Sequence, residues 1–257
     1  RPPRSTPKPS SAASDVYKRQ EGERAFEQEL RTLKGKQAIL EDNPRIAYKY
    51  NLGGGYHVSK GWEPLGLTGY YDTFGPELSF AHTIAGKVKG NIAIAKFTHS
   101  GSQIIDWTPE GSMARSRNLY PKFIQFVKDS IRELSARGHP VELEGVFYHL
   151  GENDMSFHPY RKDAATRVKA IINQSRKDLA RPELRWHVSQ QPPTDVERLN
   201  KLDVVSDMAR VAATDPDFIH LKVFNLPRQE KMLVITTEGI VQLGEVVAEG
   251  YMRNPSK

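Results

Sequence analysis

The sequence predicts an α/β fold, a three-layer α/β/α domain built on a mostly parallel central sheet. Short runs rich in apolar and β-branched residues alternate with segments of roughly 10 to 20 residues that have helical periodicity. Parallel strands need such long crossover connections, whereas antiparallel strands do not. The chain has 257 residues and a hydrophobic content of 38%, which suffices to fill the core of one domain.

In the first half of the chain, each expected element has a local signal. Residues 22–34 have the composition of a polar helix, and residues 45–50 that of a short strand. A loop rich in glycine and aromatic residues follows. Pro76 then begins a helix over residues 76–88, because proline favours the first helical position. Residues 91–97, NIAIAKF, have the nearly continuous apolar character of a strand that is covered on both faces.

The second half repeats this alternation of helix and strand. Residues 119–138 place apolar side chains at helical spacing and end at Gly138, a favourable helix C-terminus. Further strands are expected at residues 141–150, 184–190 and 218–224, and further helices at residues 159–180, 194–213 and 238–252. Because no internal repeat is visible, one domain is the simplest architecture.

The first 20 residues form a tail that differs in composition from the rest of the chain. Residues 1–20 contribute +4 of the net charge of +6, so the remaining chain is close to neutral. The stretch SSAASDVYKRQ is what a transposase sequencing adaptor encodes, and its proline, serine and lysine content is also typical of a disordered segment. We therefore expect an artefactual or disordered tail in residues 1–20, and a single domain in residues 21–257 whose start is missing.

Composition excludes several classes of site and partner. The chain contains no cysteine, so disulfides, thiolate nucleophiles and cysteine metal sites are excluded. It has no run of about 18 apolar residues of the kind that spans a membrane. Outside the tail, no basic run is interleaved with aromatic residues, so neither a membrane nor a nucleic acid is an expected partner.

Two expected strand ends carry unusual polar residues, and ligands of open parallel sheets bind beyond the carboxyl ends of the strands. THSGSQIIDW follows the strand at 91–97, and GEND follows the strand at 141–150. Gly101 can let a backbone N–H approach a ligand closely, and Asn153 can donate to a developing oxyanion. An ordinary turn explains either motif on its own, since these are common turn residues. Ser102 lacks the setting of a nucleophile elbow and is expected to cap or turn the chain.

The other polar residues near GEND allow more than one role. Glu152 and Asp154 either organise the loop or carry protons. His149 is expected to be a packed strand-end side chain rather than a base. The spacing of His149 and His158 around the two acids matches no metal-ligand pattern, so no metal site is expected.

Four segments together resemble, in order and spacing, the sialate O-acetylesterase-like domain of the SGNH hydrolase superfamily. They are FGPELSFAHTIA, AKFTHSGSQIIDW, GVFYHLGEND and TTEGIVQLGEVVAEGY, and the resemblance covers residues 40–252. It implies the flavodoxin-like three-layer fold that the pattern of elements also predicts.

The resemblance is carried by three motifs. The family's Gly-Pro-Glu matches residues 75–77, and its Gly-Gly-Thr/Ser turn before a tryptophan matches residues 100–102 before Trp107. Its Trp-x-Gln-Gly-Glu-Ser/Asn-Asp strand end matches residues 148–154. In that last motif a tyrosine stands for the tryptophan and a leucine for the glutamine.

The resemblance also implies which residues do the chemistry. In the family, a serine of a Gly-Gln-Ser-Asn segment attacks an acetyl ester, and the histidine of a D-x-x-H segment, held by the aspartate, takes its proton. The oxyanion is stabilised by the serine amide, by a glycine amide that matches Gly101 and by a carboxamide that matches Asn153. Glu152, next to Asn153, belongs to the same oxyanion and substrate motif. No Gly-Gln-Ser-Asn occurs in the chain, and its expected place is upstream of residue 21. Val234 stands at the histidine position and Lys231 at the aspartate position.

A rival D-x-x-H is present in DFIH, which makes Asp217 and His220 a second candidate pair for acid and base. It lies ahead of the expected turn and inside a strand-like run, where His220 is expected to be a core or strand-end side chain. Aromatic residues of the loop at 51–74 either form a platform for a sugar or pack over the edge of the sheet.

The resemblance implies a carbohydrate O-acetylesterase-type hydrolase domain that is inactive as written. Its substrate is an acetylated carbohydrate or another small ester, and it needs no cofactor. The family tends to be secreted or periplasmic, although the composition leaves the compartment open. The alternative is a catalytically dead pseudoenzyme that binds a glycan or acts as a scaffold.

Overall fold

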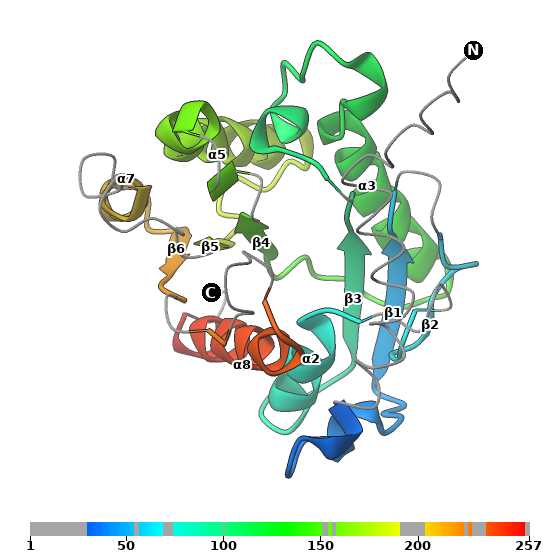
Figure 1. Cartoon of the computed structure of the whole chain (residues 1–257). Coiled ribbons are helices and arrows are strands. Elements are labelled where there is room, and N and C mark those ends of the chain that lie inside the picture. Colours follow the sequence, from blue (N-terminus) through cyan, green and yellow to red (C-terminus); the bar gives the residue numbers. More distant parts are fainter. Residues whose placement is uncertain are drawn as a thin grey trace, which may run out of the picture.

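The structure of the protein is a computed structural model, which describes residues 30–53, 57–68, 74–99, 101–150, 154–155, 158–190, 204–223, 226–227 and 235–254. The predicted α/β class and the mostly parallel pairing of the strands are confirmed (Figure 1). The strands are β1 (Ile46–Asn51), β2 (Glu63–Pro64), β3 (Ile92–Phe97), β4 (Val146–Leu150), β5 (Trp186–Gln190) and β6 (Phe218–Leu221). The helices are α2 (Glu77–Ala85), α3 (Tyr120–Ala136), α5 (His158–Asp178), α7 (Val204–Thr214) and α8 (Thr237–Arg253), with short 3-10 segments η1 (Gln37–Leu40), η2 (Ile104–Trp107) and η3 (Arg115–Arg117).

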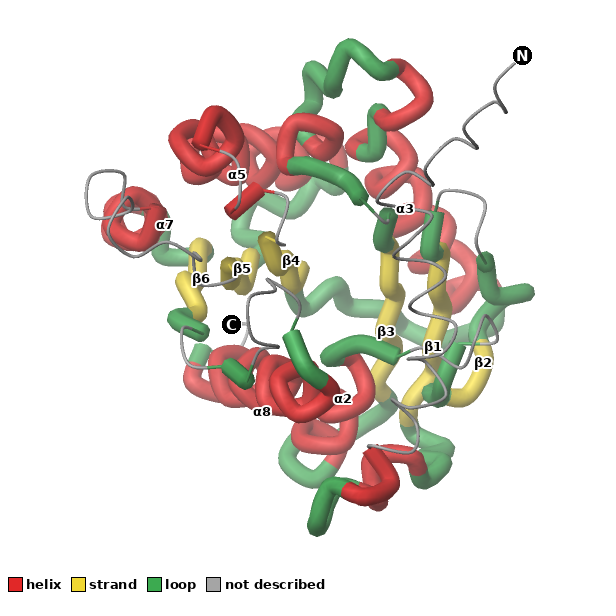
Figure 2. Tube along the Cα trace, in the orientation of Figure 1, coloured by secondary structure: helices red, strands yellow, loops and turns green. Residues whose placement is uncertain are grey.

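The central sheet consists of two three-stranded halves in the described part of the chain. One half has the order β2-β1-β3, and the other has the order β4-β5-β6. All pairs are parallel except β1 with β2, a two-residue antiparallel pairing. Figure 2 shows that the two halves stand beside each other with β3 facing β4.

Helices cover both faces of the strands and give the three layers. On one face, α3, α5 and α7 pack over an apolar cluster centred on Trp186 and Phe218. On the other face, α2 and α8 pack over a cluster that includes Phe80 and Val247. The two helices α2 and α8 approach closely at Gly244, where a Cβ atom would collide with the side chain of Ser79. A residue without a side chain is therefore required at this crossing.

The start of α2 is fixed by a buried polar cluster. Oε1 of Glu77 accepts hydrogen bonds from Lys96 Nζ at 2.7 Å, from the Gly75 amide at 2.9 Å and from the Tyr48 hydroxyl at 3.2 Å. Burial, and next the Glu77 carboxylate, raise the pKa of Tyr48 well above its usual value. The Gly-Pro-Glu motif noted in the sequence thus ties α2 to β1 and β3, because Glu77 contacts a side chain from each strand.

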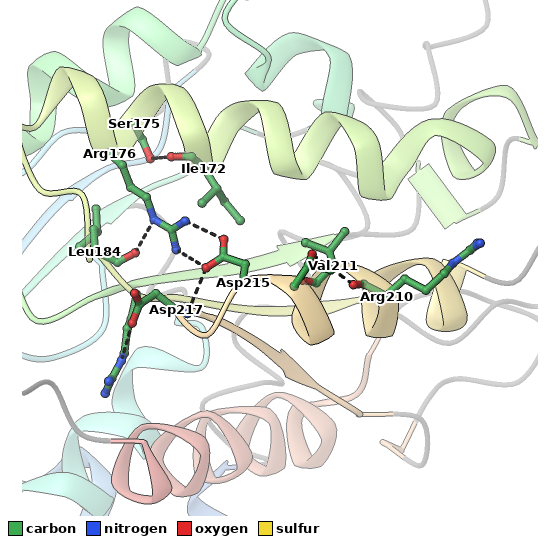
Figure 3. A network of polar contacts seen from close by, with 10 residues as sticks. Ile172, Ser175, Arg176, Leu184, Arg210, Val211, Asp215 and Asp217 are labelled. Atoms are coloured by element: carbon green, nitrogen blue, oxygen red, sulfur yellow. Dashed lines mark hydrogen bonds and ion pairs between the residues drawn. The ribbon is translucent and has the colours of Figure 1, made fainter.

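A second polar cluster closes the amino-terminal edge of β5 and β6. The Arg176 guanidinium makes two hydrogen bonds to the Asp215 carboxylate, at 2.6 and 3.2 Å, and a third to the Leu184 carbonyl at 3.0 Å (Figure 3). Asp215 also accepts a hydrogen bond from the Asp217 amide at 3.0 Å. This cluster connects α5 to the turn that leads into β6.

The elements lie where the sequence predicts them, but several are shorter. The strand expected over residues 141–150 begins only at Val146, and the strand expected over 218–224 ends at Leu221. The expectation that NIAIAKF is covered on both faces is wrong, because Ala93 and Ala95 of β3 are exposed. Their exposure follows from the split between the two halves of the sheet. Residues 1–29, which include the expected tail and most of the expected first helix, lie outside the described residues.

Candidate active site

The carboxyl ends of β4, β5 and β6 lie at one edge, because these strands are parallel. The loop after β3 meets the end of β4 at this edge, because the Ile104 amide donates a hydrogen bond to Asp154. The residues singled out in the sequence after β3 and β4 gather at this edge. The described ones are Gly101, Ser102, Trp107 and Asp154. Glu152 and Asn153 lie outside the described residues, as do Lys231 and Val234.

The turn after β3 is fixed by an arginine that the sequence did not single out. Gly101 has a φ of +69°, a conformation that favours glycine. Its carbonyl accepts a hydrogen bond from the Arg117 guanidinium, which also pairs with the Asp106 carboxylate at 2.9 Å. Asp106 in turn accepts a hydrogen bond from the Gln103 amide at 3.0 Å. The backbone around Gly101 is therefore held in one conformation by a charged side chain from η3.

Ser102 has the structural role that the sequence predicts. Its amide donates to the His99 carbonyl at 3.3 Å, which closes the turn. Its hydroxyl oxygen accepts a hydrogen bond from the Trp107 indole N–H at 3.1 Å. The Trp107 ring makes edge contacts with Phe97 of β3 and with Tyr148 of β4. Trp107 therefore connects the ends of the two strands that face each other.

Asp154 joins the end of β4 to the loop after β3. Its Oδ1 accepts a hydrogen bond from the Ile104 amide at 2.7 Å, and the residue is buried. The last residue of the GEND motif therefore organises a loop, one of the two roles considered for it. Burial is the main cause that raises the pKa of Tyr148, with the Asp154 carboxylate second.

His149 of β4 contacts a serine of β5 at the same edge. Its Nδ1 lies 2.8 Å from the Ser189 hydroxyl, and the two residues are register partners. Burial lowers the pKa of His149 to about 4, so the ring is neutral near pH 7. Ser189 is itself buried. A serine next to a neutral histidine resembles two members of a catalytic triad, but Nε2 of His149 has no hydrogen-bond partner in the described residues, so no carboxylate orients the ring there.

The rival pair Asp217 and His220 is separated in the structure. The Asp217 carboxylate pairs with Arg185 at 3.3 Å ahead of β6, next to the cluster of Figure 3. His220 lies within β6, and its Nε2 is 2.9 Å from Oε1 of Gln190. Burial, and next the charge of Lys222, lower the pKa of His220 to about 4. The acid and the histidine thus contact different partners.

Metal ligands and aromatic residues add little to this site. No group of three or more histidine and acidic side chains that would suit a metal occurs in the described ranges. Of the aromatic residues of the loop at 51–74, only Trp62 and Phe74 fall within the described residues, and both line the cavity between β3 and β4. The side chain of His158 is not described.

Comparison with known proteins identifies the family. The carbohydrate esterase family described as sialic acid-specific acetylesterase matches residues 43–253. The chain belongs to this family. The match covers the strand ends described above together with α8, and it agrees with the resemblance that the four sequence segments indicate. The sequence matches none of the curated proteins.

Solved structures of three other proteins have a similar fold. A protein from Arabidopsis thaliana is 20% identical, with a TM-score of 0.64, and the match covers 86% of each chain. A carbohydrate acetylesterase from Xanthomonas citri is 17% identical, with a TM-score of 0.60; the match covers 86% of this chain and 52% of that protein, so the chain spans about half its length. NanS is 13% identical, with a TM-score of 0.50, over 76% of this chain and 71% of its own. At these identities the likeness concerns the fold.

Sequence reasoning missed three residues at the carboxyl edge. Arg117, Ser189 and Gln190 each contact a residue that the sequence did single out. The signal for the last two was present, since WHVSQ places polar side chains among the apolar ones of a buried strand. Arg117 gave no signal, because one arginine in a polar loop resembles any solvated charge.

Proposed function

We propose that the chain is an acetylesterase-type domain that binds an acetylated carbohydrate or another small ester but does not hydrolyse it in its present form. The observation that carries this proposal is the state of the serines at the carboxyl edge. Ser102 accepts a hydrogen bond from Trp107, and Ser189 contacts His149. Nε2 of the His149 ring is buried and has no hydrogen-bond partner in the described residues, so no carboxylate orients the histidine next to Ser189 there.

The sequence supports the same proposal. It contains no Gly-Gln-Ser-Asn, and Val234 and Lys231 stand where the family has its histidine and aspartate. Valine can neither take nor give a proton. In subtilisin, removal of the triad serine or histidine alone lowers the rate by about a million-fold, so two absent partners leave no expected turnover.

The binding half of the site consists of oxyanion donors. We assign the backbone N–H of Gly101 and the carboxamide of Asn153 to this role, with Glu152 supporting the loop. The 2.7 Å hydrogen bond from the Ile104 amide to Asp154 supports the assignment, because it anchors the residue that follows Asn153 to the loop that contains Gly101. One such donor typically contributes about a hundred- to a thousand-fold to the rate of an intact esterase.

A second candidate function is a glycan-binding or scaffolding pseudoenzyme. Lys231 and Val234 favour it, because a parent protein with these residues lacks the family's base even when its serine is intact. The two candidates differ in the gene. A parent sequence with Gly-Gln-Ser-Asn indicates an esterase that uses another base, and a parent sequence without it indicates a binding protein.

The experiment measures hydrolysis of 4-nitrophenyl acetate by the full chain. We expect the rate to equal the background, with Ser102→Ala and Ser189→Ala variants indistinguishable from the parent. Turnover above background that Ser189→Ala or His149→Ala abolishes would overturn the inactive assignment and make that pair catalytic. Turnover that only His220→Ala abolishes would identify His220 as the base.

Binding is tested separately by calorimetric titration with an O-acetylated monosaccharide and with its deacetylated form. The proposal expects heat from the acetylated sugar alone, and Gly101→Val should weaken that binding, because a β-branched residue is strained at positive φ. Equal affinity for both sugars would contradict a site for the acetyl group.

A further inference from the structure

Helix α5, which follows β4 in the chain, begins with a buried arginine. Side chains three and four positions apart share one face of a helix, and the buried face of α5 is apolar from Ala164 to Ile172. Arg161 occupies the preceding position of that face and is only 9% exposed. The inward face of α5 therefore starts with a guanidinium group, at the end of the helix that lies nearest in the chain to the carboxyl end of β4.

The guanidinium of Arg161 has one open edge. Its Nη1 donates a hydrogen bond to the Met155 carbonyl at 2.7 Å, which is the only hydrogen bond of the group within the described ranges. Nε is buried and has no partner in the same part of the chain. The N–H bonds of Nε and Nη2 point the same way along one edge of the planar group, and this fork matches the two oxygens of a carboxylate. The fork of Arg161 is thus available for such a group.

Other partly buried arginines of the chain do face carboxylates. Arg117, Arg176 and Arg185 each pair with an aspartate, at 2.9, 2.6 and 3.3 Å. Arg161 is more deeply buried than these three, yet its guanidinium contacts only a neutral carbonyl among the described residues. A buried charge without a counter-charge is unfavourable. The surroundings of Arg161 therefore suit an anion that comes from outside the described part of the chain.

The place of Arg161 within α5 is unfavourable for a second reason. The first turn of α5 has no acidic residue, and the positive end of the helix dipole lies there. This end favours anions and disfavours cations, so an arginine that stabilises the helix is expected in the last turn, where Arg176 lies. Position and burial together indicate that Arg161 serves to bind an anion rather than to stabilise the fold.

Arg161 is attached to the loops of the candidate active site. Its partner Met155 directly follows Asp154, whose carboxylate accepts the hydrogen bond from the Ile104 amide. Ile104 belongs to the segment after β3 that also contains Gly101. A ligand whose acetyl group lies at Gly101 therefore has Arg161 on the α5 side of the same edge.

We propose that Arg161 determines specificity by binding the carboxylate of an acidic sugar through Nε and Nη2. The inference deepens the proposed function, on which it rests for the sugar, and adds that the sugar carries a negative charge. One guanidinium balances one negative charge, and its fork is planar, so a carboxylate fits better than a phosphate group with two charges. The neighbouring Lys162 is exposed, so it supplies no second cation to the buried fork.

The experiment compares two acetylated sugars that differ only at C6, O-acetylated methyl glucuronide with a carboxylate and O-acetylated methyl glucoside without one. Calorimetric titration of the full chain should show at least tenfold tighter binding of the acid, because hydrogen bonds to charged groups are the stronger ones. Arg161→Gln keeps a donor for the Met155 carbonyl but removes the charge and the fork. Both sugars should then bind with the affinity of the neutral one. Arg161→Lys keeps the charge without the fork and should lose most of the preference.

Lys162→Gln is the matched control, since it removes the same charge one residue away at an exposed position. It should leave the preference for the acid unchanged. The Tm without ligand separates binding from a structural role, because Arg161→Gln removes an unpaired buried charge and should not lower the Tm. The proposal is overturned if the parent chain binds both sugars equally, if Arg161→Gln retains the preference, or if Lys162→Gln loses it to the same extent. A Tm of Arg161→Gln clearly below that of the parent would also overturn it, since the arginine would then be structural.

Failure of this proposal can be told apart from failure of the proposed function. Binding of the neutral acetylated sugar without any preference for the acid overturns the role of Arg161 and leaves the proposed function standing. If neither acetylated sugar binds, the acetyl site is refuted, and a thermal shift with sodium methyl glucuronide against sodium chloride at equal concentration tests the carboxylate site. A rise in Tm with the glucuronide alone, absent in Arg161→Gln, supports the site. An equal rise with chloride, or no rise, overturns it.

Discussion

Replacement of Glu77 tests how the start of α2 is held to β1 and β3. Its side chain is 7% exposed and that of Lys96 is 18% exposed, with 2.7 Å between Oε1 and Nζ. Glu77→Gln preserves the size of the side chain and an acceptor oxygen for Tyr48 and the Gly75 amide. It removes only the charge that neutralises Lys96.

The magnitude follows from the distance and the burial. Two unit charges 2.7 Å apart interact by about 6 kcal/mol at an effective dielectric constant of about 20. Part of this is recovered, because the exposed part of Lys96 regains contact with water. Loss of one partner of a buried pair typically costs about 3–5 kcal/mol, and we expect Glu77→Gln to lower the free energy of unfolding by this amount. In a chain of this size the Tm should fall by about 6–20 °C.

Urea unfolding followed by circular dichroism measures the effect, with Glu110→Gln at an exposed position as the control. The control should change the free energy of unfolding by less than about 0.5 kcal/mol. The double variant Glu77→Gln/Lys96→Met should recover most of the loss, because no unpaired charge then remains. A loss below about 1 kcal/mol in Glu77→Gln, or a double variant no more stable than the single one, would refute this account of the cluster.

Two further predictions concern the candidate site and the buried histidines. Asp154→Ala removes the acceptor for the Ile104 amide and should lower the free energy of unfolding in urea by about 1–3 kcal/mol. Asp154→Asn keeps an acceptor oxygen and should lower it less. Equal losses in the two variants would contradict a hydrogen-bonding role for Asp154. Burial, and next the charge of Arg185, lower the pKa of His187 to about 4. The stability that depends on this histidine should therefore be complete above about pH 6.5. It should fall between about pH 6.5 and pH 4, because only the unfolded chain takes up the proton there, by up to about 1.4 kcal/mol per pH unit for each such histidine. His187→Phe should therefore lose less stability between pH 7.5 and 5.0 than the parent chain, and an unchanged pH dependence would show that His187 is not responsible.

Much of the fold was predictable because its signals are local. NIAIAKF and WHVSQ are apolar enough to be strands, and Pro76 and Gly138 mark where helices begin and end. The pairing of strands is not local. The two-residue strand β2 has no periodicity to detect, and the division of the sheet between β3 and β4 depends on which strands find neighbours.

The candidate site was predictable in its residue types and less so in its contacts. Gly101 and Asp154 were singled out because they follow apolar strands, and they do lie at one edge. The hydrogen bond between Asp154 and the Ile104 amide joins residues far apart in the chain, which no spacing rule encodes. DFIH shows the converse, since adjacency in sequence suggests a pair, whereas Asp217 contacts Arg185 and His220 contacts Gln190.

The division of the sheet also bears on how the protein behaves at high concentration. Among the described strands, one edge of β3 and one edge of β4 have no hydrogen-bonded neighbour, and Ala93 and Ala95 of β3 carry neither a bulky nor a charged side chain. Natural sheets usually guard such edges with lysine, proline or a covering segment, because an open edge templates aggregation. Any part of these edges that stays uncovered therefore makes aggregation between chains a competitor of folding.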